Sequence, residues 1–303
     1  MDHEWDSRNN ILKVAAPPGF DLAMTLECGQ CFRWRREGDG SFTGVACGKT
    51  ANVAQSGREL LFSIGSADEF EGFWMEYFDL GRDYEHIKHT LAEHDENMRR
   101  AVDYAGGIRI LRQDPWETLI SFIISQNANI PRIKKCIESL CRAFGEQITD
   151  GRGRMWHAFP TPEALGSCPE ADVDHCRLGY RSGYVLETAA KVMEDGAGAL
   201  AAARMLPGAE AEAYLRSFPG VGPKVADCVM LFGLGHYDRF PADVWIRRAM
   251  AAFYGFRESD ARGIAAFAAA EFGPMAGFAQ QFLFQYIRNT DSAVNASKGG
   301  SAC

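Results

Sequence analysis

Two kinds of apolar spacing divide this chain. From about Phe20 to Ile64, short apolar alternations are broken by Gly-rich turns such as "EGDGS" and "ACGKT", which is typical of antiparallel strands. From about Ala67 the apolar residues recur at helical spacing, as in "ADEFEGFWMEYF". Residues 107–290 keep that spacing almost throughout. The pattern therefore predicts an antiparallel sheet followed by a mostly helical region.

These patterns predict an α+β fold with two domains and a tail. An antiparallel β domain with flanking helices is expected over residues 1–106, and a helical domain over 107–290. Helix boundaries are clear in the second domain: in "QDPWETLISFIISQ", Asp114 is placed to cap a helix that starts at Pro115. The last residues, 291–303, lack apolar periodicity and are expected to form a flexible tail.

Charge changes this picture because it is unevenly distributed. The net charge of −8 argues at first against a nucleic-acid partner. All of the excess acid lies in residues 1–106, with 11 basic and 19 acidic residues, while the remainder has 21 of each. The helical domain can therefore present a positive face. No apolar run approaches the roughly 20 residues of a membrane helix, and "MDHEWDSRNN" is no secretory signal, so we expect a cytoplasmic (nucleoid) or nuclear protein.

The nine cysteines do not form a metal site by their spacing. Cys28 and Cys31 stand two residues apart in "LECGQCFRW", but no second CxxC pair and no tight group of four exists. A zinc ribbon or an iron–sulfur cluster needs such a group. We therefore expect no metal and no iron–sulfur cluster, with most cysteines acting as small buried hydrophobic residues.

The stretch "LRSFPGVGPKVADCVMLFGLG" carries the strongest chemical signal. Gly220, Val221 and Gly222 form a tight turn between two amphipathic helices, and the turn amides and the next helix N-terminus together can bind a phosphate. This offers an acidic protein a way to hold DNA without cationic side chains. A plain helical hairpin with a glycine turn is an equally good interpretation of the turn alone. The turn could also hold a monovalent cation.

Two ionisable residues favour an enzyme over a plain hairpin. Lys224 follows the turn at the start of a helix, where the helix dipole disfavours a cation. A neutral amine there is a nucleophile able to form a Schiff base, although a solvated lysine is the simpler interpretation. Asp243, in "RFPADVWIRRAM", is first of all a helix N-cap. A carboxylate near a sugar would also stabilise positive charge developing at C1′.

The turn, Lys224 and Asp243 resemble the helix-hairpin-helix DNA glycosylase superfamily, whose members with this lysine are bifunctional glycosylase/lyases. Six motifs narrow the resemblance to 8-oxoguanine DNA glycosylases: "GQCFRW", "SQNANIPRI", "LGYRSGYV", "FPGVGPKVADC", "FPADV" and "GFAQQFLF" follow in that family's order from about Phe20 to Asn289. The resemblance implies excision of 8-oxoguanine from duplex DNA by an N-glycosyl hydrolase with abasic-site lyase activity. It implies Lys224 as nucleophile and Asp243 as electrostatic stabiliser.

The same resemblance implies a pocket for a flipped purine. Cys228, one turn after Lys224, would lie against one face of the base and Phe284 against the other. Gln280 would contact the Watson–Crick edge, from the same helix face as Phe284. The carbonyl of Gly29 would accept a hydrogen bond from N7–H of 8-oxoguanine, and guanine lacks that donor. For Phe284 taken alone, core packing is the more frequent role.

Four further residues are implied as duplex contacts. Asn127 would enter the space that the flipped base leaves, and Arg132 and Arg181 would bond the opposite cytosine, since the guanidinium donors fit its acceptor edge. Tyr180 would wedge beside that cytosine. Nonspecific phosphate contact is the alternative for both arginines. The expected partner is duplex DNA containing 8-oxoguanine. We expect the protein to act as a monomer and not to bind a membrane.

The chain departs from the family's eukaryotic pattern in one pair of residues. Where those members have a histidine and an acidic partner, this sequence has Trp245 and Ile287. A polar pair has become apolar, which suggests a bacterial or archaeal branch with a looser demand for opposite cytosine.

The sequence is compatible with three other functions. A helix-hairpin-helix glycosylase/lyase could act on another oxidised base, and a noncatalytic protein could bind DNA through the hairpin alone. The presence of both Lys224 and Asp243 disfavours the noncatalytic alternative. A dithiol oxidoreductase would need its CxxC at the start of a helix in a βαβ unit, whereas Cys28 and Cys31 lie in the strand-like region.

Overall fold

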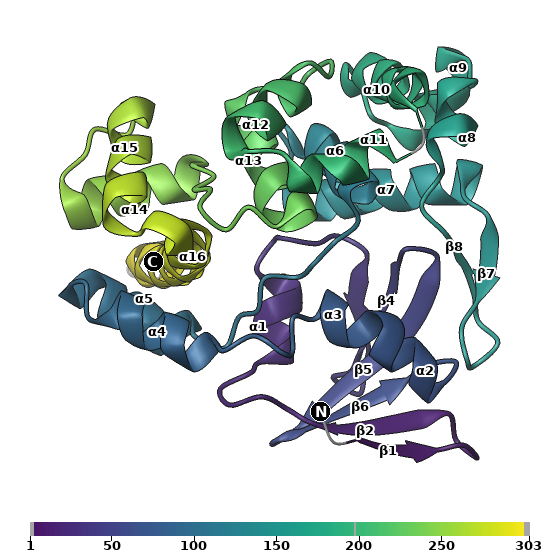
Figure 1. The fold of residues 1–303 in the computed structure, drawn as a ribbon, viewed down its shortest axis with the longest axis horizontal. Coiled ribbons are helices and arrows are strands. Elements are labelled where there is room, and N and C mark those ends of the chain that lie inside the picture. The colour runs from purple at the N-terminus through teal and green to yellow at the C-terminus, as the bar shows by residue number, and fades with distance from the viewer. Residues whose placement is uncertain (1–2, 197, 300–303) are drawn as a thin grey trace. The chain divides into compact units, whose positions relative to one another are not determined.

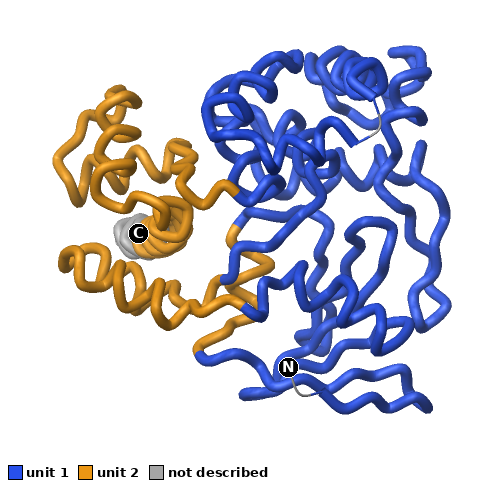
Figure 2. Tube along the Cα trace, in the orientation of Figure 1, with its two compact units in different colours: residues 1–18, 29–81, 109–235 blue, residues 19–28, 82–108, 236–303 orange. Residues whose placement is uncertain are grey.

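The computed structural model describes residues 3–196 and 198–299, with side chains described as far as residue 290. Its chain divides into two compact units, each discontinuous in sequence (Figure 2). Unit 1 comprises residues 1–18, 29–81 and 109–235, and unit 2 comprises residues 19–28, 82–108 and 236–303. The predicted boundary near residue 106 therefore does not separate the compact units, because the N-terminal sheet clusters with the first helices of the helical region.

Unit 1 contains a six-stranded antiparallel sheet (Figure 1), with strand order β1-β2-β6-β5-β4-β3. Register places Leu12 opposite Phe62, Phe62 opposite Val53, and Val53 opposite Phe42. All four side chains are at most 2% exposed, so one face of the sheet is a continuous apolar core. The strands are β1 (His3–Asp6), β2 (Ile11–Ala15), β3 (Trp34–Arg36), β4 (Phe42–Ala46), β5 (Lys49–Ser56) and β6 (Glu59–Ser63).

An aromatic cluster lies where the helical segment α2 (Ala67–Glu69), π-helical η1 (Phe70–Trp74) and α3 (Met75–Tyr77) packs on the sheet. Trp34 of β3 makes edge contacts with Trp74 and Phe78, at ring-centroid distances of 5.9 and 5.5 Å. Its indole N–H donates to the Tyr77 hydroxyl at 2.9 Å. Large buried aromatic rings of this kind dominate the packing energy of a core. Trp34 of the "FRW" motif thus anchors the sheet to its covering helices.

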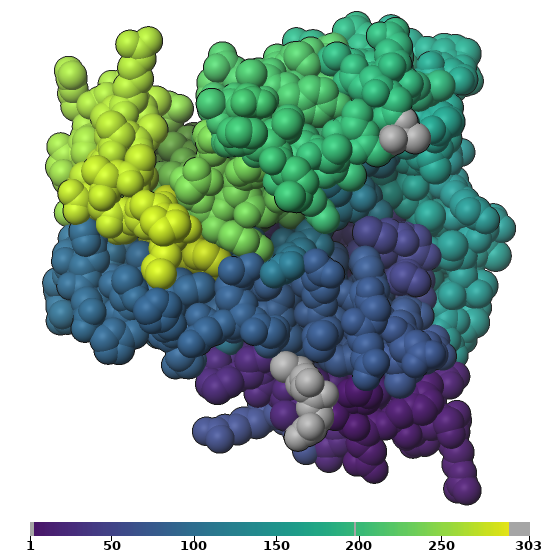
Figure 3. Space-filling model, viewed as in Figure 1, coloured from purple at the N-terminus to yellow at the C-terminus, as the bar shows by residue number. Residues whose placement is uncertain are grey.

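The rest of unit 1 is helical, with one exception. The exception is the hairpin of β7 (Gln147–Thr149) and β8 (Met155–His157), which lies in a region predicted to be helical. In the space-filling view the teal and green helices of this unit make a continuous surface (Figure 3). These elements are α6 (Pro115–Ser125), α7 (Ile130–Phe144), α8 (Pro162–Gly166), α9 (Glu170–Val173), η2 (Asp174–Cys176), α10 (Arg181–Asp195), α11 (Ala199–Ala202), η3 (Ala203–Met205), α12 (Gly208–Arg216), α13 (Pro223–Val229) and the π-helical η4 (Met230–Leu234).

Unit 2 is a helical bundle. Helix α16 packs against α5 and α14, and α4 packs against α5. The bounds are α1 (Leu22–Glu27), α4 (Tyr84–Ala92), α5 (Glu96–Ala105), α14 (Val244–Tyr254), α15 (Ala261–Glu271), η5 (Gly273–Met275) and α16 (Ala276–Gly299). None of the described helices is long and apolar enough to cross a bilayer.

Some of the secondary-structure predictions are confirmed and others are wrong. The α+β class is confirmed, and Asp114 caps α6 by accepting from the Glu117 amide at 2.9 Å. The strand prediction beginning near Phe20 was wrong at its start: residues 22–27 are helix α1, because the Asp21 carboxylate caps it through the Met24 amide. Helix α16 also continues to Gly299, so residues 291–299 are helical rather than irregular.

Candidate active site

The hairpin predicted to bind phosphate is formed by α12, a turn over residues 217–222, and α13 (Figure 1). Gly220 has φ +74°, and a Cβ there would lie 2.5 Å from the Tyr184 ring. Only glycine fits both the backbone conformation and the space. Gly222 begins α13 without any side-chain cap, so the first amides of the helix are left for another acceptor. Phosphate binding by this turn stays a prediction, with which the uncapped start of α13 is compatible.

Lys224 lies at the start of α13 and is half-buried. Its ammonium nitrogen Nζ lies 5.1 Å from the centroid of the Phe122 ring of α6. That distance allows a cation–π contact, which limits where the amine can point. Phe122 is itself fixed by stacking on Phe232 of η4, at 5.6 Å and 14°. Cys228, one turn after Lys224, is 3% exposed.

The loop of Gly29 is tied into the same unit. Gly29 has φ +91°, in the left-handed region that favours glycine. The Gln30 amide donates to the Arg109 carbonyl at 2.8 Å and accepts from the Leu111 amide at 2.9 Å. Gln113 in turn donates to the Gln30 carbonyl at 2.7 Å. Three hydrogen bonds to the chain that leads into α6 therefore hold the backbone next to Gly29 rigid.

Phe32 links this loop to the lysine. Its ring contacts the Phe122 ring edge-on at 5.7 Å, and Phe122 is the ring that faces Lys224. Gly29, Lys224 and Cys228 thus belong to one continuous packing arrangement inside unit 1. Phe122 and Gln30 were not assigned roles from the sequence, although "GQCFRW" and "SFIIS" contain them. Only the packing shows that these two residues support the site.

The predicted duplex contacts come together at the loops before α7 and α10. Asn127 is exposed, has φ +50°, and donates from Nδ2 to the Tyr180 hydroxyl at 3.1 Å. Tyr180 is 57% exposed. Arg132 is exposed near the start of α7. We call the surface formed by Asn127, Arg132 and Tyr180 the duplex-contact surface.

Arg181 differs from its neighbours because it is only 3% exposed. Its guanidinium donates to the carbonyls of Gln126 and Leu178, with Nε to the Gln126 oxygen at 2.8 Å and Nη1 to the Leu178 oxygen at 2.9 Å. It also lies 4.5 Å from the Tyr180 ring centroid. In this conformation Arg181 holds the backbone that precedes Asn127 and supports Tyr180 from beneath.

The remaining predicted site residues lie in unit 2 and are described within it. Asp243 is half-buried and caps α14, accepting from the Ile246 amide at 2.9 Å. Gln280 of α16 is 4% exposed, and its amide donates to the Pro241 carbonyl at 3.1 Å. Gln280 therefore fixes the segment that leads into Asp243. Phe284 is half-buried, with the Arg288 guanidinium 5.8 Å from its ring centroid.

The family's polar pair is absent from this unit as the sequence indicated. Ile287 is 5% exposed and packs in the apolar interior. Trp245 is half-buried, and the guanidinium of Arg248, one turn along α14, lies 5.0 Å from its ring centroid.

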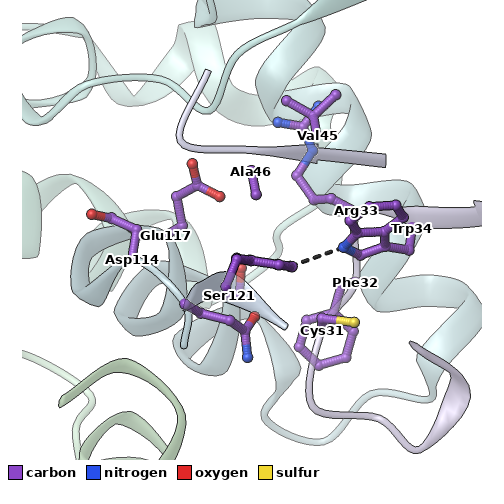
Figure 4. A pocket seen from close by; sticks show the side chains of 11 residues that line it. Cys31, Phe32, Arg33, Trp34, Val45, Ala46, Asp114, Glu117 and Ser121 are labelled. Carbon is purple, nitrogen blue, oxygen red and sulfur yellow. Dashed lines mark hydrogen bonds between the residues drawn. The ribbon is translucent and has the colours of Figure 1, made fainter. Parts of the chain in front are cut away.

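Partly buried ionisable groups line a small pocket in unit 1 (Figure 4). Asp114 and Glu117 lie together at the start of α6 and line it with Arg33. Burial first, and then the neighbouring Asp114 carboxylate, raise the pKa of Glu117 to about 7. The Arg33 guanidinium opposes this shift, and the Cys47 amide donates to Glu117 Oε1 at 2.9 Å. The pocket therefore holds two neighbouring carboxylates at the start of α6, the helix that also carries Phe122.

The cysteines behave largely as expected. Within the described chain none of them forms a disulfide, and Cys28 and Cys31 are 1% and 4% exposed. Cys47 and Cys168 are exceptions, since the first is exposed and the second is half-buried. Among the residues that the structure describes, no three His, Cys, Asp or Glu side chains are close enough together to hold a metal ion.

Comparison with known protein families matches nearly the whole chain. Residues 12–119 match the model of the 8-oxoguanine DNA glycosylase N-terminal domain. Residues 120–274 match that of the HhH-GPD superfamily base excision DNA repair proteins. The junction between the two matches falls inside α6, later than the boundary near residue 106 that the apolar spacing predicted.

Individual relatives and solved structures are similar to the chain over most of its length. A probable N-glycosylase/DNA lyase of Methanothermobacter thermautotrophicus is 32% identical, over 89% of this chain and 94% of its own. The structure of MBOgg1 in complex with a low-affinity DNA ligand is 42% identical with a TM-score of 0.91, covering 96% of this chain and all of that one. The Clostridium acetobutylicum 8-oxoguanine glycosylase/lyase, solved with double-stranded DNA containing cytosine opposite 8-oxoguanine, is 37% identical with a TM-score of 0.90, covering 96% and 99%.

Proposed function

Because the chain belongs to the HhH-GPD superfamily of base excision DNA repair proteins, we propose that it is a bifunctional DNA glycosylase. It removes 8-oxoguanine from duplex DNA and then cleaves the strand at the abasic site. The observation that carries this is Lys224, placed directly after the Gly220–Gly222 turn and held against the Phe122 ring. A glycosylase without lyase activity has no need of an amine there.

Lys224 is the proposed nucleophile. Its neutral amine attacks C1′ as the bond from C1′ to the base breaks, and the base leaves with a proton. Opening of the sugar ring gives a Schiff base between Lys224 and C1′. Loss of a C2′ proton then expels the 3′ phosphate by β-elimination, and water releases the lysine. Asp243 stabilises the positive charge that develops on the sugar during the first step.

Selection of the base is assigned to four residues. The Gly29 carbonyl would accept from N7–H of 8-oxoguanine. The hydrogen bonds of the Gln30 side chain and of its carbonyl support this by tying the adjacent residue in place. Cys228 and Phe284 would contact the two faces of the base. Gln280 would read its Watson–Crick edge, which requires its amide to exchange the Pro241 carbonyl for the base.

The strand opposite the lesion is assigned to the duplex-contact surface. Asn127 would enter the vacated position and Tyr180 would stack beside the opposite cytosine, which requires the hydrogen bond between them to break. Arg132, whose guanidinium has no recorded partner among the described side chains, is available to the cytosine edge. Arg181 would have to release the Gln126 and Leu178 carbonyls to do the same.

We further propose that no metal takes part in the chemistry, since Lys224 and Asp243 supply the nucleophile and the stabilising charge. A chelator should then leave excision unchanged. A monovalent cation in the 217–222 turn is compatible with phosphate binding there and would show as potassium-dependent affinity. We place the protein with chromosomal DNA, in the nucleoid or the nucleus, acting as a monomer.

The experiment that tests the function is a panel of duplexes with 8-oxoguanine opposite each of the four bases, assayed under single-turnover conditions. Each is analysed with and without heat and alkali, so that base release and strand cleavage are measured separately. We expect release of 8-oxoguanine and strand cleavage without alkali. Activity on other oxidised bases but none on 8-oxoguanine would assign the chain to a different lesion.

A further inference from the structure

Arg177 has an unusual backbone conformation for its residue type. It follows the short helix η2 with φ +57° and ψ 35°, in the left-handed region. Of the other non-glycine residues with positive φ in the described chain, Asn10, Asp79 and Asn127 are of the types that tolerate this region, whereas Cys47 is not. An arginine with a long side chain is disfavoured there, so something other than local propensity must account for it.

Packing does not explain the arginine side chain. The backbone of Arg177 is well fixed: its amide donates to the Asp174 carbonyl at 3.0 Å, and its carbonyl accepts from Cys136 Sγ at 3.5 Å. The side chain is exposed. Although Asp172 and Asp174 precede it, the guanidinium has no hydrogen bond or ion pair recorded with any described residue. Glycine would satisfy every contact that the fold makes with this position.

The location of Arg177 suggests what the side chain does. Cys136, which holds the Arg177 carbonyl, lies one turn after Arg132 on α7. Tyr180 follows Arg177 by three residues and is 57% exposed. Arg177 therefore borders the duplex-contact surface on the side formed by α7 and the start of α10. It adds to the edge of that surface a guanidinium that forms no ion pair with any described residue.

We propose that Arg177 is a DNA-backbone contact, which binds a phosphate beside the duplex-contact surface. This rests on the proposed function, since it requires the surface to face DNA. A guanidinium binds phosphate by charge-assisted, often bidentate, hydrogen bonds. A residue with strained backbone lowers the stability of the folded protein, and such residues are found at functional sites. The proposal therefore predicts opposite effects of one substitution on stability and on affinity.

The test compares Arg177→Gly with the wild-type protein and with Arg58→Gly. Arg58 is an exposed arginine of the β5–β6 turn in the same unit, without positive φ or a recorded ion pair, so the control removes the same charge elsewhere. Binding to an undamaged duplex is measured over a series of KCl concentrations, together with the thermal midpoint. Single-turnover excision of 8-oxoguanine by the wild type is measured in parallel.

We expect Arg177→Gly to weaken binding roughly eightfold at about 0.1 M salt, because each phosphate contact contributes about 0.9 to the slope of log K against log salt. The salt slope should fall by about 0.9 for the same reason. The midpoint should stay unchanged or rise by up to about 3 °C, since backbone strain is relieved. Arg177→Lys should keep most of the affinity, and Arg58→Gly should change neither affinity nor slope.

Two results would overturn the proposal. A salt slope for Arg177→Gly equal to that of the wild type would mean that no phosphate is contacted. A clear fall in its thermal midpoint would mean that the side chain is needed for the fold. If the wild type fails to excise 8-oxoguanine, the proposed function fails, but the salt slope of the variant still decides whether Arg177 contacts DNA.

Discussion

Replacing Glu117 by glutamine should stabilise the protein at neutral and alkaline pH. In the folded state burial and the Asp114 carboxylate raise the pKa of Glu117 from 4.5 to about 7. Between these values the folded protein holds a proton that the unfolded chain has lost, so the free energy of unfolding falls as the pH rises from 4.5 to 7. At 1.36 kcal/mol per pKa unit the shift corresponds to about 3 kcal/mol. The side chain is partly exposed, which reduces the expected loss to about 1–3 kcal/mol.

Glutamine removes this loss while keeping the local contacts. Its carbonyl oxygen can accept from the Cys47 amide in place of Glu117 Oε1, and its amino group can face Asp114 without repulsion. Urea unfolding should therefore give Glu117→Gln and the wild type nearly equal stability near pH 4.5, with the variant more stable by about 1–3 kcal/mol near pH 8.

Glu146 is the matched control, because it is exposed and has no recorded ion pair among the described residues. Glu146→Gln should leave the pH profile of stability unchanged. A constant difference between Glu117→Gln and the wild type at both pH values would refute the reasoning, since it would show that Glu117 titrates alike in the folded and unfolded states.

Four further substitutions test the site. Gly29→Ala, at φ +91°, should lower stability by about 1–2 kcal/mol and reduce the excision ratio of 8-oxoguanine over guanine; an unchanged ratio in single-turnover assays would remove Gly29 from base selection. Gly220→Ala should lower both the thermal midpoint and DNA affinity, because its Cβ would lie 2.5 Å from a tyrosine ring, whereas Gly222→Ala, in open space, should be close to neutral in stability. Asp243→Asn should keep the thermal midpoint, since asparagine caps a helix equally well, but slow base release by about 10²–10³-fold; near-normal release would leave Asp243 as a cap only.

Local signals in the sequence predicted local structure well. Asp114, Asp243 and the turn before Lys224 were placed correctly because capping and glycine turns depend on a few neighbouring residues. Helix α1 was missed because six residues are too few to show helical periodicity among strands. The β7–β8 hairpin was missed for the same reason, since each strand has only three residues.

Long-range features were beyond the sequence. Nothing in the spacing shows that Phe122 faces Lys224, or that Arg181 is buried while Arg132 is exposed, because these depend on contacts between distant segments. The compact units likewise join segments such as 29–81 and 109–235, which a linear reading separates. The sequence identified the candidate site residues, but it did not predict their burial or their contacts.

The most direct test of the account is borohydride trapping on a duplex with 8-oxoguanine opposite cytosine. The wild type should form a covalent protein–DNA adduct, because reduction fixes the Schiff base between Lys224 and C1′. Lys224→Gln should bind the same duplex but give no adduct. An adduct of undiminished yield with Lys224→Gln would contradict the account, because the nucleophile would then be another group.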